Sequence, residues 1–300
     1  MTYRKYKLDK KYYENLSKEE LVILKILEGV VNDISLIYEL QIKHGFYPKG
    51  VTKKELEKEN RIDPKILSPF TMVVKKNGVL EAIPYHIHFA KYLKPIAKKI
   101  EKAVSISTNK SFKAYLQARA KSLLDGSYED AFKSWLDVKN SRLDFTVAPV
   151  EKHLDKVLSI KQVFQAHVGI VDKQYTALLE GYKETLYSSA KLGFSKYHST
   201  DIPQKGVSVV VEVTPAISGY PADVLSSGQY FPKDVNLALQ YGTKTIIYTS
   251  QITYKFERLY YPIFKTIFEK RFASKYPKEL LLEASDWTIF LYELGKQLHK

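Results

Sequence analysis

The sequence predicts an α+β protein that is mainly helical, with a small hairpin and a small mixed sheet. Apolar residues recur at helical spacing along most of the chain, an Asn-Gly dipeptide separates two β-rich runs, and a β-branched run follows later. Of 300 residues, 45% are hydrophobic. This is enough for one large or two modest packed domains.

Capping signals begin the first helices. Ser17-Lys18-Glu19-Glu20 is a capping box, and the helical spacing after it predicts a long amphipathic helix that ends near His44-Gly45. Thr52-Lys53-Lys54-Glu55 repeats the pattern and predicts a short charged helix. Asp63-Pro64 should end that helix, because the residue before a proline disfavours the helical region.

A hairpin is expected at residues 71–83, where Asn77-Gly78 supplies the positive φ angles of a tight turn and Pro84 ends the second strand. Helical spacing then returns from Tyr85 to about Leu124. Asp125-Gly126-Ser127 should break it and cap the next helix, which runs through Trp135.

The second half combines helices and strands. The pattern after Pro149 is interpreted as helical to about residue 192, and the loop that follows is the candidate domain boundary. The expected strands are 207–213 and 243–248, and the expected closing helices are 251–273 and 277–298. The predicted organisation is a mainly helical region at 1–195, a strand-rich region at 196–250 and C-terminal helices at 251–300.

Composition narrows the chemistry. The absence of cysteine excludes disulfides, thiolate metal sites and a cysteine nucleophile. The net charge of +14 raises the alternative of a basic nucleic-acid-binding protein, but the lysines are dispersed as doublets, usually near glutamate, which disfavours that alternative. Without a signal peptide or an 18-residue apolar stretch, a cytoplasmic protein that does not span a membrane is expected.

Several short motifs give little evidence for an active site. Phosphate-binding loops and the Gly-x-Ser-x-Gly elbow are absent, and Ser107-Thr108-Asn109-Lys110 fits a helix cap better than a Ser-x-x-Lys site. His86 and His88 could share a metal on a strand, but on a helix they point about 200° apart.

The last expected helix has the outline of His-Glu-x-x-His without either histidine. In a zincin helix, two histidines at i and i+4 bind zinc while the glutamate polarises the attacking water. Here the corresponding positions hold Tyr292 and Lys296, with Glu293 retained. A lysine is cationic at neutral pH and repels Zn²⁺, so this pair does not hold the metal in the usual way.

Further stretches, in the same order along the chain, carry a likeness to a known family. They are Gly45-Phe46-Tyr47-Pro48, Ala82-Ile83-Pro84-Tyr85-His86, Tyr115-Leu116-Gln117-Ala118-Arg119-Ala120, Ser134-Trp135-Leu136-Asp137-Val138-Lys139-Asn140, Ala148-Pro149-Val150-Glu151, Phe231-Pro232-Lys233-Asp234 and Lys255-Phe256. With Phe290 to Leu298, they make the chain resemble the bacterial and archaeal relatives of dipeptidyl peptidase III. These are zinc peptidases with a helical metal-bearing lobe facing a mixed lobe.

The resemblance implies the N-terminal half of that two-lobed fold, and it implies where a cleft lies. Tyr292 and Lys296 stand where the family carries its two histidines, and Lys300 ends the sequence before the helix with the family's glutamate ligand. No metal and no cofactor are therefore expected. Glu151, His86 and Tyr85 are the expected substrate-binding residues, and Lys296 is expected to pair with Glu293 or Glu151.

The leading hypothesis is thus a pseudopeptidase without a catalytic residue, which binds peptides or a protein partner. Extended peptides would add to a sheet edge, because main-chain bonding requires no metal. One alternative is a hydrolase with a rebuilt metal or non-metal site, built from His86, His88, His153 and His167. Another is a subunit whose missing C-terminal part a separate chain supplies; the ligand, the partner and the oligomeric state are not specified by the sequence.

Overall fold

A computed structural model describes residues 1–193, 207–268 and 276–298, and it confirms the predicted α+β class. The chain divides into two compact units. Unit 1 comprises residues 1–5, 13–168 and 216–224, and unit 2 comprises residues 6–12, 169–215 and 225–300. In the described part of the chain, no helix is both long and apolar enough to cross a membrane.

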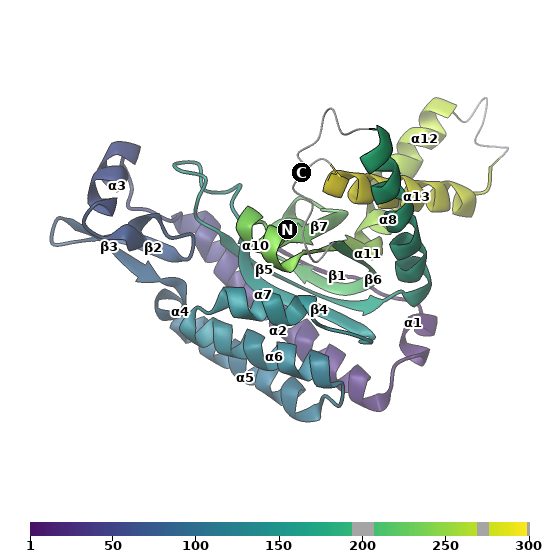
Figure 1. Cartoon of the computed structure of the whole chain (residues 1–300), viewed down its shortest axis with the longest axis horizontal. Helices are drawn as coiled ribbons and strands as arrows, with labels where there is room; N and C mark the ends of the chain where they lie inside the picture. The colour runs from purple at the N-terminus through teal and green to yellow at the C-terminus, as the bar shows by residue number, and fades with distance from the viewer. Residues whose placement is uncertain (194–206, 269–275, 299–300) are drawn as a thin grey trace. The chain divides into compact units, whose positions relative to one another are not determined.

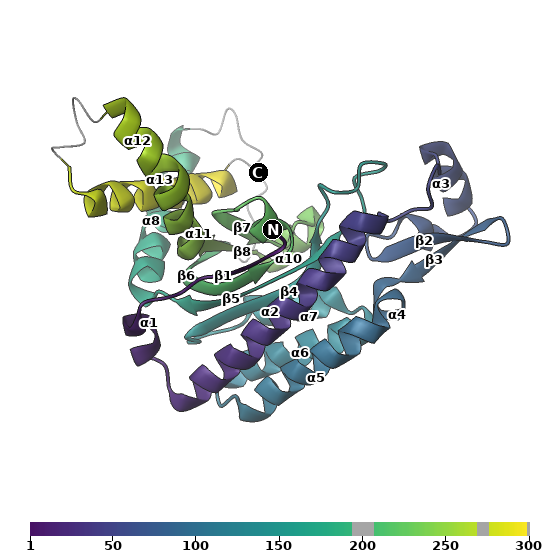
Figure 2. The ribbon, with the colours of Figure 1, turned by 180° about the vertical axis from the view of Figure 1, so that it is seen from behind.

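Helices build most of unit 1, as predicted. Four of them pack in sequence, α2 on α5, α5 on α6 and α6 on α7, and Figures 1 and 2 show α2, α5 and α6 side by side. The helices of this unit are α2 (Lys18–His44), α3 (Lys53–Asn60), α4 (Tyr85–His88), α5 (Ala90–Ile106), α6 (Lys110–Asp125), α7 (Tyr128–Leu136) and α9 (Tyr220–Asp223), with the 3₁₀ helix η1 (Pro64–Leu67).

The predicted caps are present. The Ser17 hydroxyl accepts a hydrogen bond from the Glu20 amide at 3.1 Å, and the Glu20 carboxylate accepts one from the Ser17 amide at 2.8 Å. The Thr52 box that begins α3 has the same reciprocal bonds. Gly126 ends α6 in the left-handed conformation at φ 82°, which glycine adopts without steric cost. The positions of these three helix ends were therefore predictable from local sequence.

The predicted hairpin consists of β2 (Thr71–Lys76) and β3 (Val79–Pro84), with Asn77 at φ 51° and Gly78 at φ 84°. A buried lysine fastens it to the rest of unit 1. The Lys161 ammonium donates to the carbonyls of Ile66 and Ser68 at 2.7 Å each, and to the Thr71 hydroxyl at 2.6 Å. The three acceptors lie in η1, directly after it and at the start of β2.

The larger sheet has six strands in the order β4-β5-β6-β8-β7, with β1 (Tyr3–Lys5) paired to β6. The others are β4 (Leu143–Glu151), β5 (Val163–Val171), β6 (Val207–Ser218), β7 (Gly228–Phe231) and β8 (Thr243–Tyr248). β6 and β8 are parallel, whereas β7 and β8 are antiparallel, so the sheet is mixed as predicted.

The helical interpretation of residues 148–192 was wrong over its first part, where β4 ends and β5 follows. All nine residues of β4 are buried, and so are eight of nine in β5. A strand buried on both faces loses the polar alternation that separates it from a buried helix segment. Pro149 is tolerated because β4 is the end strand of the order. Only α8 (Lys173–Gly193) is helical there.

Unit 2 packs α8 and α13 (Lys278–Leu298) around one core cluster, with members Leu179, Val209, Val211, Ile247, Ile252, Phe290 and Leu294. The unit also holds α10 (Val235–Tyr241), α11 (Thr249–Lys255), a π-helical turn η2 (Phe256–Tyr260) and α12 (Tyr261–Phe268), and α1 (Lys10–Glu14) begins in it. Strands 207–213 and 243–248 and the final helix were predicted correctly. The loop expected at the domain boundary, 194–206, lies outside the described residues.

Candidate functional site

Helix α13 carries Tyr292, Glu293 and Lys296, and its apolar face fixes their orientation. Phe290 and Leu294, one turn apart, are 0% and 2% exposed in the core of unit 2. The Trp287 ring packs against Phe290 and Tyr175, with centroids 5.8 Å and 6.2 Å away. Because residues at i, i+3 and i+7 share a face, these three anchors determine which motif residues turn inward.

Tyr292, Glu293 and Lys296 differ strongly in environment. Tyr292 is 62% exposed, so its ring projects away from the core. Glu293, by contrast, is only 4% exposed. The Lys296 ammonium lies 2.8 Å from Glu293 Oε2, and its side chain is 35% exposed. The ion pair that the sequence suggested therefore forms within the helix, with the lysine directed at the retained glutamate.

Glu293 also lies against the end strand of the sheet. A Cβ built on Gly228, the first residue of β7, would come within 3.0 Å of Glu293 Cγ and Cδ. Glycine at this position therefore leaves the space that the glutamate side chain occupies. β7 is last in the strand order, so Glu293 lies beside the end strand of the sheet.

A second lysine belongs to this site. Lys255 ends α11, which packs on α13. Burial lowers the pKa of Lys255, and the nearby Glu293 carboxylate opposes that shift. The sequence singles out Lys255 only through the family likeness, because nothing local marks a lysine at a helix end as a partner of a residue 38 positions later. Gly228 was a better signal, since an isolated glycine at a strand indicates close approach of another group.

The other predicted site residues, Tyr85, His86 and Glu151, lie in unit 1. Tyr85 is 1% exposed, and its ring packs against Phe89 and Phe164 at 5.7 Å each, as part of the core. His86 is half-buried with Nδ1 2.9 Å from the position of a Cβ on Gly126. Glu151, 4% exposed at the end of β4, accepts a bond from the His153 amide at 3.2 Å. Their substrate-binding role stays a prediction.

The four histidines proposed for a rebuilt active site do not form one metal-binding group among the described residues. His86 and His88 lie on α4, where helical geometry keeps two residues at i and i+2 from sharing a metal. His153 is exposed at the surface beside Glu151, with Nε2 3.4 Å from its carboxylate. His167 lies close to a different buried acid: its ring and the Asp144 carboxylate bring potential ligand atoms within 4.8 Å. His86, His88 and His153 form no such group with it in the described part of unit 1.

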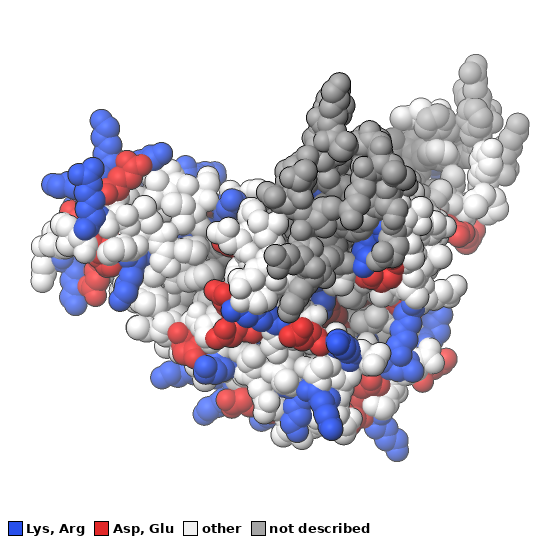
Figure 3. All heavy atoms as spheres, viewed as in Figure 1, with Lys and Arg blue, Asp and Glu red and all other residues white. Residues whose placement is uncertain are grey.

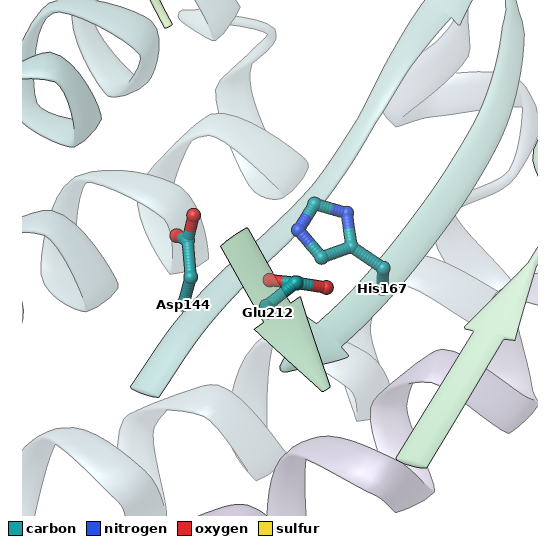
Figure 4. Close-up of side chains that lie close together, drawn as sticks. All are labelled: Asp144, His167 and Glu212. Carbon is teal, nitrogen blue, oxygen red and sulfur yellow. The ribbon is translucent and has the colours of Figure 1, made fainter. Parts of the chain in front are cut away.

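Asp144 was not among the residues predicted from sequence. Its Oδ1 accepts hydrogen bonds from the Trp135 indole at 2.7 Å and from the Phe145 amide at 2.8 Å. Figure 4 shows Asp144 on β4 and His167 on β5, together with Glu212 on β6. In unit 2, Glu212 Oε1 accepts a bond from the Thr214 hydroxyl at 3.0 Å, and Gly169 leaves room for its carboxylate.

The architecture matches solved peptidase structures. Dipeptidyl peptidase III from Caldithrix abyssi superposes with a TM-score of 0.77 at 20% sequence identity. The alignment covers 85% of this chain and 59% of the Caldithrix abyssi chain. The enzyme from Corallococcus sp. strain EGB gives 0.75 at 19% identity, covering 87% and 59%. The chain has a dipeptidyl-peptidase-III-like fold. It spans 59% of the length of each of those solved chains.

A comparison of sequences finds a similar protein that is named as a hydrolase. Nudix hydrolase 3 of Arabidopsis thaliana is 26% identical over 222 residues, which is 73% of this chain and 28% of that protein. No family model matches the chain. The dipeptidyl-peptidase-III-like fold expected from the ordered motifs is thus confirmed by the structures.

Proposed function

We propose that this protein is a catalytically inactive relative of dipeptidyl-peptidase-III-like zinc peptidases, which binds extended peptides or a protein partner. The single observation that carries this proposal is the ion pair of Lys296 with Glu293 at 2.8 Å. In an active zincin helix the glutamate polarises a metal-bound water. Here an ammonium engages that carboxylate, and the other ligand position holds the outward-facing Tyr292.

The sheet of the fold supports peptide binding. An extended peptide can add to the edge of a sheet through main-chain hydrogen bonds, without any metal. In this proposal Glu293 and Lys296 act in binding rather than in hydrolysis.

Elemental analysis tests the inactive state directly. The full chain is dialysed against zinc, washed and measured by mass spectrometry of the metal; we expect far less than one zinc per chain. The double substitution Tyr292→His and Lys296→His restores two histidines at i and i+4, so it should retain more zinc than Tyr292→His alone. Stoichiometric zinc in the unmodified chain, with hydrolysis of a dipeptidyl chromogenic substrate, would overturn the proposal.

A hydrolase with a rebuilt active site is the second candidate, and two observations favour it. One is the match to a protein whose name is that of a hydrolase. The other is the buried pair of Asp144 and His167, which offers one carboxylate and one imidazole ligand. In this case metal would bind to the unmodified chain and would be lost in Asp144→Asn and His167→Gln, while Lys296→Gln would leave it unchanged.

The nucleic-acid alternative has weaker support. Around α3 and the β2–β3 hairpin, Figure 3 shows basic side chains next to acidic ones, and ion pairs join Lys53 to Glu57 and Lys76 to Glu81. Interleaved charges of this kind do not form the continuous basic stripe that tracks a phosphate backbone. A shift assay at low salt with duplex and single-stranded probes should therefore give no complex.

A further inference from the structure

The outer edge of β3, in the two-stranded sheet of unit 1, carries backbone groups that β2 does not use. In an antiparallel pair, residues whose N–H and C=O groups bond the partner strand alternate with residues whose groups point away from it. Val73 of β2 belongs to the second kind, because its amide donates to the Phe46 carbonyl at 2.9 Å. Ala82 lies directly opposite Val73, so its backbone groups also point away from β2, and those of Leu80 do the same.

The two edges of this sheet therefore differ. Phe46 covers the edge of β2, whereas no hydrogen bond reaches the backbone of Leu80 or Ala82 from any part of the chain that the structure describes. Neither residue is fully buried, and Val79 at the start of the strand is 61% exposed. An unpaired edge of this kind is a template for another extended chain.

The edge of β3 lacks the usual protection against pairing. Native edge strands are commonly protected by lysine, by an internal proline or by a bulge. In β3, the one charged residue is Glu81, which pairs with Lys76 on β2 at 4.0 Å. Pro84 is the last residue of the strand, and all six residues of β3 pair one to one with β2. The other four residues are apolar, so the strand favours an added β-strand.

The side chains along the edge provide a surface for such a strand. Leu80 and Ala82 pack against the cluster of Leu56, Ile66 and Val73, so the inner face beside the edge is apolar.

Charged residues lie at the turn end of this face. A cavity of about 140 Å³ is lined by Leu80 and by residues that include Lys49, Lys75, Glu55 and Glu59. Glu55 already serves the cap of α3. Within the described residues, neither Lys49 nor Lys75 has an ion-pair partner. A carboxylate on an added strand would give these two lysines a counter-ion.

Charge also decides which occupant fits. Residues 45–84 carry eight Lys or Arg against five Asp or Glu, and the whole chain has a net charge of +14. A second copy is disfavoured, because antiparallel pairing about Glu81 would place two glutamates side by side and bring two basic chains together. An acidic segment is attracted instead.

We propose that the outer edge of β3 binds an extended acidic segment of a protein partner as a third strand. β-branched residues of that segment pack beside the apolar side chains of β3, and a carboxylate pairs with Lys49 or Lys75. This inference rests on the binding function proposed above, to which it adds a defined surface and a class of partner.

Three dye-labelled peptides with blocked ends test the inference by fluorescence anisotropy on the full chain at low salt. The first is Asp-Thr-Val-Thr-Val-Asp, the second has lysine in place of both aspartates, and the third is the acidic peptide N-methylated at each threonine and valine. We expect the acidic peptide to bind about five- to tenfold tighter than the lysine peptide. N-methylation should weaken binding at least as much, because a methylated amide donates no hydrogen bond.

Variants assign the binding to β3. Ala82→Pro removes an outward N–H but no bond to β2, so the affinity for the acidic peptide should fall about fivefold. Ala82→Ser keeps the N–H and is the matched control, which should bind like wild type. If Ala82→Pro does not fold, the N-methylated peptide decides on the wild-type chain: undiminished binding of that peptide would refute strand addition.

The remaining outcomes separate this inference from the proposed function. Full affinity in a folded Ala82→Pro variant would refute the β3 edge but leave peptide binding standing, and equal binding of the acidic and lysine peptides would refute the acidic partner. Absence of binding by every peptide would overturn both proposals. A dimer in analytical ultracentrifugation that Ala82→Pro dissociates would show that a second copy occupies the edge, which would also overturn the inference.

Discussion

Replacing Lys161 with methionine tests a buried, hydrogen-bonded charge in unit 1. Lys161 is 0% exposed, and its ammonium donates three hydrogen bonds of 2.6–2.7 Å to η1, to Ser68 just after η1, and to β2. Methionine fills a similar volume but donates nothing, so the carbonyls of Ile66 and Ser68 lose their bonds to the ammonium. Each acceptor left unsatisfied in a buried site costs about 1–3 kcal/mol.

Charge burial offsets part of that loss. Burial lowers the pKa of Lys161 from 10.5 to about 8, while the carboxylate of Asp155 opposes the shift. The lowered pKa means that keeping this lysine charged costs the folded state roughly 3 kcal/mol relative to the unfolded state. Lys161→Met removes the buried charge and its cost, which offsets part of the loss of hydrogen bonds. We therefore expect a net destabilisation of about 2–4 kcal/mol at pH 7.

The pH dependence follows from the sign of the shift. Between pH 8 and 10.5 the unfolded chain keeps the lysine proton that the folded chain has lost, so the unfolded state binds more protons and wild-type stability rises with pH. Methionine does not titrate. The gap between wild type and Lys161→Met should therefore widen by about 1.4 kcal/mol per pH unit inside this window, and by roughly 3 kcal/mol in total.

Urea denaturation followed by Trp135 fluorescence, in a Trp287→Phe background, measures this gap from pH 7 to 10. Trp135 is fully buried in unit 1 and reports on the unit that holds Lys161. Lys65→Met, which removes an exposed lysine from η1, serves as the matched control and should show no widening. A gap that is constant or narrows above pH 8 would show that the pKa of Lys161 is not lowered.

Two further substitutions probe unit 2. Gly169→Ala would place a Cβ about 2.1 Å from Glu212 Cδ, so we expect the free energy of unfolding to fall by about 2–4 kcal/mol in thermal or urea denaturation. A second substitution, Glu212→Ala, should relieve this loss. The control is Gly181→Ala on α8, which has nothing within 4 Å and should be neutral or stabilising. Burial, and then Glu283, raises the pKa of Asp286 to about 7, so the folded state holds that proton more tightly and wild type loses stability as pH rises from 4 through 7. Asp286→Asn should exceed wild type by up to about 4 kcal/mol at pH 8 and match it near pH 4; equal stabilities at pH 8 would contradict the shift.

Elements with a local signal were predictable from the sequence. The Ser17 and Thr52 boxes each satisfy their helix ends within four residues, and Asn77-Gly78 determines its turn by backbone preference alone. β4 and β5 gave no such signal. Their burial comes from what packs on both faces, and this depends on residues far away in the chain.

The candidate site was predictable to the same extent. The i, i+3 spacing of Glu293 and Lys296 lies in the sequence, so their ion pair could be anticipated. The approach of Glu293 to Gly228 and its interaction with Lys255 join segments 65 and 38 residues apart. Only the folded sheet and helices bring these together, because no rule of local spacing relates them.

The pairing of β1 with β6 has a consequence for synthesis of the chain. Tyr3, Arg4 and Lys5 pair with Ser218, Ile217 and Ala216. Residues 216–218 must therefore emerge from the ribosome before β1 can form its strand contacts. Closing so long a loop costs entropy before the strand contacts repay it, which makes such pairing slow and late. β1 can therefore pair only after residues 216–218 have been synthesised.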